Sequence, residues 1–444
     1  MTTNAQWTNN TMRAACPNTS VTLNLLLVLA CVLSGCNSET APPAKTPSQP
    51  VASQPATSAS ETNAADTHRQ LSDEQLAALL QARLPDDQLS QGWVRLFDGV
   101  TLMGWQPQPN ANFHVEDNAL VADEGKPCLL TTDSSWKDFE LQVEFQAETD
   151  TNSGVFVRTP ATQTDPANNC YEINIANDEN PFPTGSIVKR QKVDATAAGP
   201  QTPDQWRQMT IIAKGDQITV KLGDQIVCEY QDPNPLPARQ IGLQYRFGRI
   251  AFRNVLIRPL DLESLLDAEL TQWKQYPEMP GSFTINEDQQ LHVQGGRTQL
   301  ETNDRYGDFT LLARYKIDQP NMNSGIFFRC IPGDEMMGYE CQVNNDYETS
   351  RLQPADHGTG GIFRRQEARF VAGDNGQWAT VLLQASGNKI AAWVNGIQVS
   401  QWQDQREPHE NPRKGLRTDP GTIMIQGHDP GTDVLYSHLE ISTL

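Results

Sequence analysis

The stretch that decides the fold is Asn152-Ser153-Gly154-Val155-Phe156-Val157-Arg158, because it returns later as Asn323-Ser324-Gly325-Ile326-Phe327-Phe328-Arg329. Further landmarks repeat around it in the same order. They are Asp138-Phe139-Glu140-Leu141 with Asp308-Phe309-Thr310-Leu311, Tyr171-Glu172-Ile173-Asn174 with Tyr339-Glu340-Cys341-Gln342, Thr184-Gly185-Ser186-Ile187 with Thr359-Gly360-Gly361-Ile362, and Gln205-Trp206 with Gln377-Trp378. The interval between the copies is far longer than a solenoid repeat, so the sequence predicts two tandem domains.

Each copy consists of short runs in which apolar and polar residues alternate. Examples are Phe139, Leu141, Val143 and Phe145 in the first copy and Ile390, Ala392 and Val394 in the second. Period-two alternation bounded by Gly, Asn, Asp and Pro is typical of half-buried antiparallel strands. Asn395-Gly396 predicts a type I′ hairpin turn, because both residues tolerate positive φ. Many strands and almost no helix predict an all-β protein of two tandem two-sheet sandwiches.

The landmarks together resemble the 3-keto-disaccharide hydrolase domain family, a relative of the concanavalin A-like lectins and glucanases. Leu96-Phe97-Asp98-Gly99, Gly104-Trp105 and the closing Arg253-Asn254-Val255-Leu256-Ile257 add to the repeated motifs. The resemblance covers both copies, although the second lacks the Leu-Phe-Asp-Gly opening. It implies two concanavalin A-like (jelly-roll) sandwiches with short connecting helices.

The expected organisation follows from these patterns and from composition. It is a lipoprotein signal peptide with its lipidated cysteine (1–36), a Pro/Ser/Thr/Ala-rich linker (37–70), a short helix (71–90), the first sandwich (91–260), a connecting helix (261–274) and the second sandwich (275–444). Ser72 and Gln75 have capping-box spacing at the first helix. Leu262, Leu265, Leu266 and Leu270 recur at helical spacing in the connector.

Alternation predicts which side chains share a face of a sheet. Glu340 and Gln342 point to one side of their strand and Tyr339 and Cys341 to the other. The concave sheet carries ligands in such sandwiches. The expected site in the second copy therefore comprises Arg329, Glu340, Gln342, Gln426 and His428. The first copy offers Arg158, Glu172, Asn174 and Gln244 as substrate-binding residues, with Tyr245-Arg246 in place of Gly427-His428.

The resemblance implies cleavage of a glycosidic bond in a sugar oxidised at C3. The ketone acidifies the C2 proton, so a base removes it, the C1 substituent leaves by elimination, and water adds later. Either Glu340 or His428 would be the base. Either Arg329 or a divalent metal ion held by Glu340 and His428 would take the enolate charge. Two carboxylates flanking the scissile bond, as in ordinary glycosidases, are not required.

Two other functions fit the same residues. A carbohydrate-binding, lectin-like surface protein without catalysis would have the same fold and polar face. A lipid-tethered scaffold for other surface proteins is the third reading. We expect a hydrolase or lyase on 3-keto-glycosides that works in the second domain, with a carbohydrate as its partner.

The start of the chain predicts export. Leu33-Ser34-Gly35-Cys36 closes an apolar run that is too short to span a bilayer and resembles a lipobox, in which Cys36 would be acylated. The expected location is the cell envelope, lipid-anchored on the periplasmic face or at the outer membrane. The net charge of −20 argues against nucleic acid as a partner.

The cysteines after Cys36 are Cys128, Cys170, Cys228, Cys330 and Cys341. An odd number leaves at least one thiol unpaired, and buried single thiols are expected for most of them.

Overall fold

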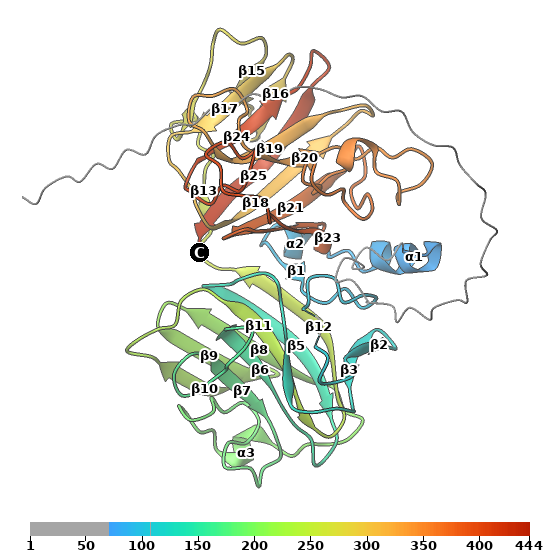
Figure 1. The fold of residues 1–444 in the computed structure, drawn as a ribbon, viewed down its shortest axis with the longest axis vertical. Coiled ribbons are helices and arrows are strands. Elements are labelled where there is room, and N and C mark those ends of the chain that lie inside the picture. Colours follow the sequence, from blue (N-terminus) through green and yellow to red (C-terminus); the bar gives the residue numbers. More distant parts are fainter. Residues whose placement is uncertain (1–70, 107) are drawn as a thin grey trace, which may run out of the picture. The chain divides into compact units, whose positions relative to one another are not determined.

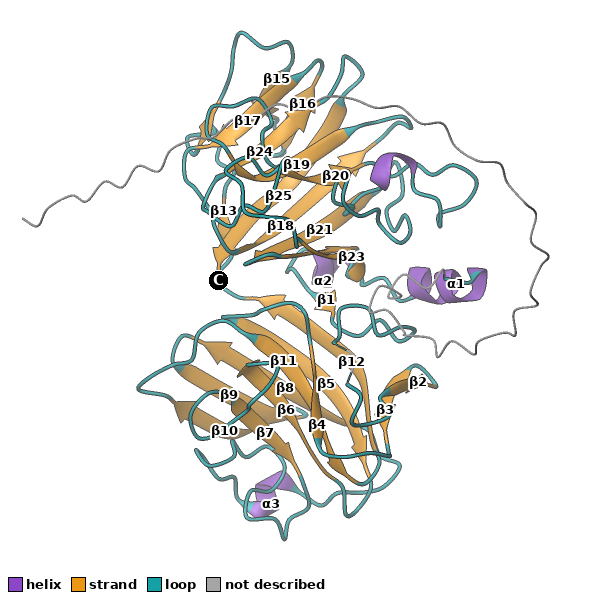
Figure 2. Cartoon of the chain, in the orientation of Figure 1, coloured by secondary structure: helices purple, strands orange, loops and turns teal. Residues whose placement is uncertain are grey.

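The computed structural model describes residues 71–106 and 108–444, and its regular structure is almost entirely β-strand (Figures 1 and 2). The first sandwich has an eight-stranded sheet with the order β10-β9-β8-β5-β12-β3-β2, with β1 on β12, and a four-stranded sheet with the order β4-β11-β6-β7. Its strands are β1 (Val94–Arg95), β2 (His114–Glu116), β3 (Ala119–Ala122), β4 (Cys128–Thr131), β5 (Phe139–Ala147), β6 (Asn152–Thr159), β7 (Tyr171–Ile175), β8 (Arg207–Lys214), β9 (Gln217–Leu222), β10 (Gln225–Gln231), β11 (Gln240–Phe247) and β12 (Ile250–Pro259).

The second sandwich repeats this plan. Its eight-stranded sheet has the order β15-β16-β25-β18-β21-β22-β23, with β13 on β25, and its five-stranded sheet has the order β14-β17-β24-β19-β20. The strands are β13 (Glu263–Ser264), β14 (Trp273–Lys274), β15 (Ser282–Ile285), β16 (Leu291–Gln294), β17 (Thr298–Thr302), β18 (Phe309–Ile317), β19 (Ser324–Cys330), β20 (Tyr339–Val343), β21 (Trp378–Ser386), β22 (Lys389–Val394), β23 (Ile397–Gln403), β24 (Thr422–Gly427) and β25 (Asp433–Thr443). The predicted tandem sandwiches are confirmed.

The repeated motif forms corresponding strands in the two copies. It lies in β6 and β19, and the Tyr-Glu motif that follows it forms β7 and β20 beside them. The hairpin turn predicted at Asn395-Gly396 is also present, since Val394 pairs with Ile397 and the two turn residues have φ values of 49° and 82°. Local sequence therefore fixes both the strands and their connection.

Helices are few and short: α1 (Asp73–Gln81), α2 (Asp86–Leu89), α3 (Ala195–Ala198) and the 3₁₀ turn η1 (Ala355–His357). The capping box is present at α1, where Gln75 N donates to Ser72 Oγ and Ser72 N donates to Gln75 Oε1. Leu76 and Leu79 of α1 are buried in the core of the second sandwich. The helix thus belongs structurally to the later domain.

The prediction of a connecting helix over 261–274 is wrong. The segment contains β13, a turn and β14, and Asp267 caps the turn through the backbone N–H groups of Glu269 and Thr271. The leucines serve two cores: Leu262 packs on the first sandwich, whereas Leu265 and Leu270 are buried in the second. Their helical spacing was coincidental, because pairing of β13 with β25 extends the chain instead.

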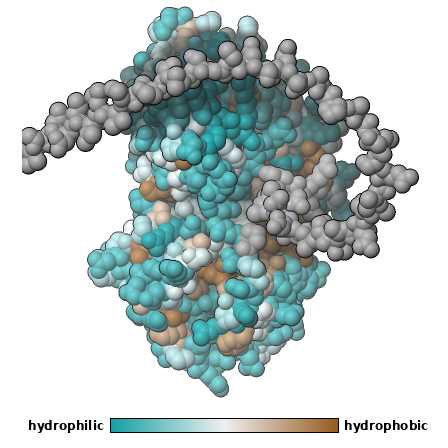
Figure 3. Space-filling view, viewed as in Figure 1, coloured by the Kyte–Doolittle hydropathy of each residue, from teal (hydrophilic) through white to brown (hydrophobic). Residues whose placement is uncertain are grey.

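The two sandwiches contact each other directly within one compact unit. The rings of Trp136 and Trp393 meet edge to face with centroids 6.0 Å apart. Lys389 Nζ lies 2.9 Å from Asp133 Oδ1, and Arg369 Nη2 lies 2.8 Å from Asp98 Oδ2. An aromatic contact and two ion pairs therefore join the two sandwiches. The face of the molecule drawn in Figure 3 is mostly hydrophilic, with apolar residues in small separate patches.

The predicted signal peptide, Cys36 and linker lie outside the described residues. Within the described part of the chain, no helix has the length and apolar character needed to cross a membrane. Cys128, Cys170, Cys228, Cys330 and Cys341 are all free, and all except Cys128 are buried.

Candidate functional site

The five-stranded sheet of the second sandwich has one apolar and one polar face, as the alternation predicts. Tyr339 and Cys341 on β20 point into the core, and Glu340 lies on the opposite side. Gly325 faces Glu340 on the neighbouring strand, where a Cβ atom would lie only 2.9 Å from Glu340 Oε1. The glycine of the repeated motif therefore makes room for this carboxylate.

A pocket of about 370 Å³ opens on this polar face. It brings together three of the predicted residues, Glu340, Gln426 and His428. Gln342 lies behind its wall and donates from Nε2 to Asn323 Oδ1 at 2.8 Å. The other lining residues are Arg297, Asn323, Glu335, Met336, Met337, Asp356, Phe363, Arg364 and Arg413.

The Glu340 carboxyl group is 8% exposed and accepts no hydrogen bond from the described residues. Burial raises its pKa to about 7, because the charged form loses hydration. Arg413 and Arg364 oppose the shift, whereas Asp356 adds to it. A carboxyl group with a pKa near neutrality can accept or release a proton under physiological conditions.

His428 follows β24 and has a side chain that is 44% exposed. Its Nδ1 lies 2.9 Å from Asp429 Oδ2, and its backbone N–H donates to Thr432 Oγ1. These contacts fix the ring and leave Nε2 without a partner among the described residues. The imidazole is therefore oriented and can still exchange a proton with a ligand.

Two arginines at the pocket have no carboxylate partner in the described part of the chain. Arg413 donates from Nη2 to the Met336 carbonyl at 2.9 Å, and the Arg364 guanidinium lies over the Phe363 ring. By contrast, Arg297 is paired with Glu335. Both unpaired charges come from loops rather than strands, so alternation gave no signal for them.

The turn η1 carries strained backbone beside the pocket. Asp356 and His357 have φ values of 44° and 73°, a region that non-glycine residues seldom occupy. Hydrogen bonds to both side chains stabilise this backbone conformation. Asn323 Nδ2 donates to Asp356 Oδ2 at 2.6 Å, and the backbone N–H of Arg364 donates to His357 Nε2 at 2.9 Å. Such strain persists where the surroundings enforce it, and it concentrates at functional sites.

Sequence reasoning did not find Asp356 or Asn323 as site residues. One signal was available, because the connection after the Tyr-Glu strand is longer in the second copy (344–358) than in the first (176–183). The extra residues include η1 and lie at the polar face.

Arg329 does not belong to this pocket. Its side chain is fully buried and donates to the carbonyl groups of Gly307, Gly387 and Arg417 and to Asp308 Oδ1. Arg158 makes the same set of bonds in the first copy, to Lys137, Gly215 and Leu236 and to Asp138. Neither guanidinium is available to a ligand.

The corresponding face of the first sandwich differs. Glu172 and Gln244 occupy the positions of Glu340 and Gln426, and burial raises the pKa of Glu172. Asn174 donates to the Phe182 carbonyl. Leu129 lies so close to Gly242 that a Cβ there would meet it at 2.8 Å. An apolar side chain thus stands where the second copy has Gln299.

The residues do not fit the expected metal site. In the described ranges, no three His, Cys, Asp or Glu side chains are grouped so that they could hold a metal ion. Glu340 and His428 therefore have no third ligand of this kind, whereas protein metal sites commonly have three or more.

The sequence profile of the 3-keto-alpha-glucoside-1,2-lyase-like domain matches residues 92–258 and again residues 261–442. No curated protein matches the chain in sequence. The two matched segments correspond to the two sandwiches, so the sequence resemblance is confirmed over both copies.

Several solved structures resemble part of this chain. A candidate glycosyl hydrolase from Parabacteroides distasonis is 18% identical, covers 40% of this chain and 99% of its own, and gives a TM-score of 0.36. The carbohydrate-binding module CBM66 from Bacillus subtilis is 16% identical over 35% of this chain and 95% of its own, with a TM-score of 0.28. The Bacillus licheniformis β-glucanase is 12% identical, covers 38% of this chain and 96% of its own, and gives a TM-score of 0.29.

Proposed function

The chain belongs to the family of 3-keto-alpha-glucoside-1,2-lyase-like domains, with two tandem copies, and from this premise we propose that its second sandwich cleaves 3-keto-glycosides. The observation that carries the proposal is Glu340, a buried carboxyl group with a pKa of about 7 in a pocket that also holds two arginines without carboxylate partners. A base and a stabiliser of negative charge are the two elements that the reaction needs.

In the proposed first step, ionised Glu340 removes the proton from C2 of the sugar. The C–H electron pair forms the C2=C3 bond, and the carbonyl π pair moves to the oxygen at C3. Arg413 and Arg364 would stabilise this enolate oxygen, taking the role that the sequence suggested for Arg329.

In the second step, the enolate returns its electrons, a C1=C2 bond forms and the bond from C1 to the leaving oxygen breaks. Protonated His428 is the proposed donor: its Nδ1–H would bind Asp429 Oδ2, and its Nε2–H would pass its proton to the leaving oxygen. Water then adds across C1=C2 to complete hydrolysis. If the unsaturated sugar leaves first, the outcome is a lyase reaction.

The first sandwich is proposed to be non-catalytic. It has Arg246 in place of His428, and Leu129 covers part of the corresponding face. The second candidate function for the whole chain is therefore carbohydrate binding without cleavage. The first copy favours this function, because it keeps Glu172 and Gln244 but has no counterpart of His428.

The test is incubation of residues 71–444 with a 3-keto-disaccharide and with its unoxidised parent, followed by mass spectrometry. We expect cleavage of the keto form alone. Glu340→Gln should lower the rate by about 10²- to 10⁴-fold, the usual contribution of a general base. Glu172→Gln is the matched control and should retain the rate. Binding of either sugar without cleavage would reject catalysis in favour of the binding function.

We also propose that Cys36 anchors the chain by acylation to the cell envelope. The support is the lipobox-like Leu33-Ser34-Gly35-Cys36 and the polar linker that follows. Labelling cells with an alkyne fatty acid should mark the wild-type protein and leave Cys36→Ala unlabelled. Labelling of both proteins, or of neither, would reject the anchor.

A further inference from the structure

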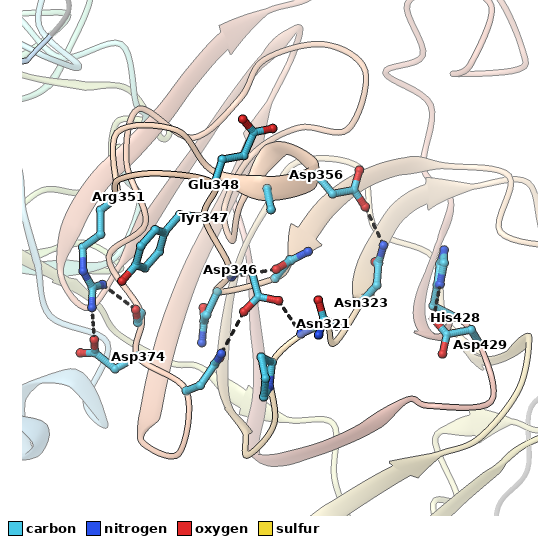
Figure 4. A pocket seen from close by; sticks show the side chains of 16 residues that line it. Asn321, Asn323, Asp346, Tyr347, Glu348, Arg351, Asp356, Asp374, His428 and Asp429 are labelled. Carbon is cyan, nitrogen blue, oxygen red and sulfur yellow. Dashed lines mark hydrogen bonds and ion pairs between the residues drawn. The ribbon is translucent and has the colours of Figure 1, made fainter.

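A second cavity adjoins the Glu340 pocket. It has a volume of about 750 Å³ and shares Asn323, Asp356 and His428 with that pocket (Figure 4). Both volumes lie in the range of small-molecule sites. The two cavities therefore lie side by side, and together we call them the trough, with Glu340 in one part and Tyr347 in the other.

The wall of the second cavity contains a buried donor and a buried acceptor that have no partners. Asn345 is 5% exposed; its Oδ1 accepts from Tyr315 and Thr359, while its Nδ2 is unpartnered. Asn375 has the opposite arrangement, since its Nδ2 donates to Asp346 and its Oδ1 is unpartnered. A hydroxyl group both donates and accepts, so hydroxyl-rich ligands can satisfy both amides.

The same cavity is lined by an exposed aromatic ring. Tyr347 is 45% exposed, whereas most large apolar side chains of the described chain are buried. The Arg351 guanidinium lies 5.6 Å from the Tyr347 ring centroid, and Figure 4 shows both at the end of the cavity opposite His428. An aromatic ring offers a flat apolar surface to the C–H face of a sugar and a hydroxyl group at its edge.

Charge distinguishes the two parts of the trough. The Tyr347 cavity is lined by Asp346, Glu348, Asp374 and Asp429, with Arg351 as its arginine. The Glu340 pocket instead holds three arginines, which offset its three carboxylates, Glu335, Glu340 and Asp356. Carboxylates accept hydrogen bonds from hydroxyl groups and repel anions, so the Tyr347 cavity favours an uncharged ligand.

We propose that the Tyr347 cavity is a second saccharide subsite, which holds a neutral glycosyl unit linked to the ring that reacts at Glu340. Tyr347 stacks on this unit, and Asn345 and Asn375 bind its hydroxyl groups. The proposal rests on the function proposed above for the Glu340 pocket and adds which residues recognise the rest of the substrate.

The test compares two substrates on residues 71–444: a 3-keto-disaccharide, and a methyl 3-keto-glucoside that has no second ring. Tyr347→Ala should raise KM for the disaccharide by about tenfold, as loss of an aromatic contact would, and leave KM for the methyl glycoside unchanged. Tyr347→Phe should retain the wild-type KM. Phe247→Ala is the matched control, because Phe247 is similarly exposed on the first sandwich. Equal effects on both substrates, or no effect on either, would overturn the subsite.

Calorimetric titration with the unoxidised disaccharide separates this proposal from the proposed function. If the wild-type protein cleaves neither keto-sugar, the proposed function fails. Weaker binding of the disaccharide to Tyr347→Ala than to Phe247→Ala would still support the subsite. Equal affinity of these two variants would reject it.

Discussion

Burial of the Glu340 carboxyl group lowers the stability of the folded protein when this group is ionised. Its pKa of about 7 exceeds the 4.5 of a free glutamate, so the folded protein binds this proton more tightly than the unfolded chain does. The free energy of unfolding therefore falls as pH rises from about 4.5 to about 7 through this group. The ionised carboxylate is the base that we propose, so the proposed activity and the stability of the fold make opposite demands on one side chain.

Glu340→Gln should consequently raise stability at pH 8 by at most about 3 kcal/mol, the value of the pKa difference, and have little effect at pH 4. In the wild type, turnover should rise with pH as Glu340 ionises, with the midpoint of the rise near its pKa of about 7. Urea unfolding and initial rates across this range measure both effects. A Glu340→Gln protein no more stable than wild type at pH 8 would show that the carboxylate is well solvated.

At the scale of elements, the repeated motif explains why both copies fold alike although only one has the proposed catalytic pocket. The arginine that ends each motif lies where β6 or β19 meets the turns of the eight-stranded sheet. Asp138 Oδ1 and Asp308 Oδ1 each accept from the arginine and from a turn glycine, Gly215 N or Gly387 N. The motif is therefore an internal brace between the two sheets.

Arg329→Met should destabilise the second sandwich by about 3 kcal/mol, because three carbonyl groups lose this donor and Asp308 loses its cationic partner. The rate per folded molecule should change little. Arg158→Met should destabilise the first sandwich similarly and serves as the control. Urea unfolding followed by tryptophan fluorescence, with kcat measured at low temperature, checks this. Normal stability with lost turnover would instead assign Arg329 to catalysis.

At the scale of the whole molecule, the segment before the first sandwich stabilises the second. Leu76 and Leu79 enter the core of the second sandwich, and Leu84 N donates to Asn395 O at the β22–β23 turn. Arg83 pairs with Asp374, which also pairs with Arg351 in the wall of the Tyr347 cavity. The segment before the first sandwich thus contacts the second sandwich, which also follows the first sandwich in the chain.

A chain that begins at Gly92 should therefore lose stability mainly in its second sandwich, because it exposes the apolar surface that α1 covers. Scanning calorimetry should show a lower Tm than for a chain that begins at Leu71. Arg83→Gln, which removes the ion pair alone, should have a smaller effect. Equal Tm values for the two chains would show that α1 contributes nothing to the second domain.

The sequence by itself determined the local structure of this protein. Alternation placed Glu340, Gln426 and His428 on a polar face, Asn395-Gly396 specified a hairpin, and the repeated motif specified two domains. These features depend on neighbouring residues and on the two-residue period of a strand, so they can be predicted without knowing what packs on them. The leucines of 261–274 misled the same reasoning, because their spacing does not say which core each one enters.

The tertiary structure alone decided which polar residues meet. Arg329 and Arg413 look alike in the sequence, yet Arg329 is bound by three carbonyl groups and Asp308, whereas Arg413 donates to one carbonyl group at the pocket. Asp356 and Tyr347 reach the trough on a loop, and α1 docks on a domain that begins far later in the chain. Loops have no periodicity and long-range contacts have no local signature, so only the assembled sheets determine where these side chains lie.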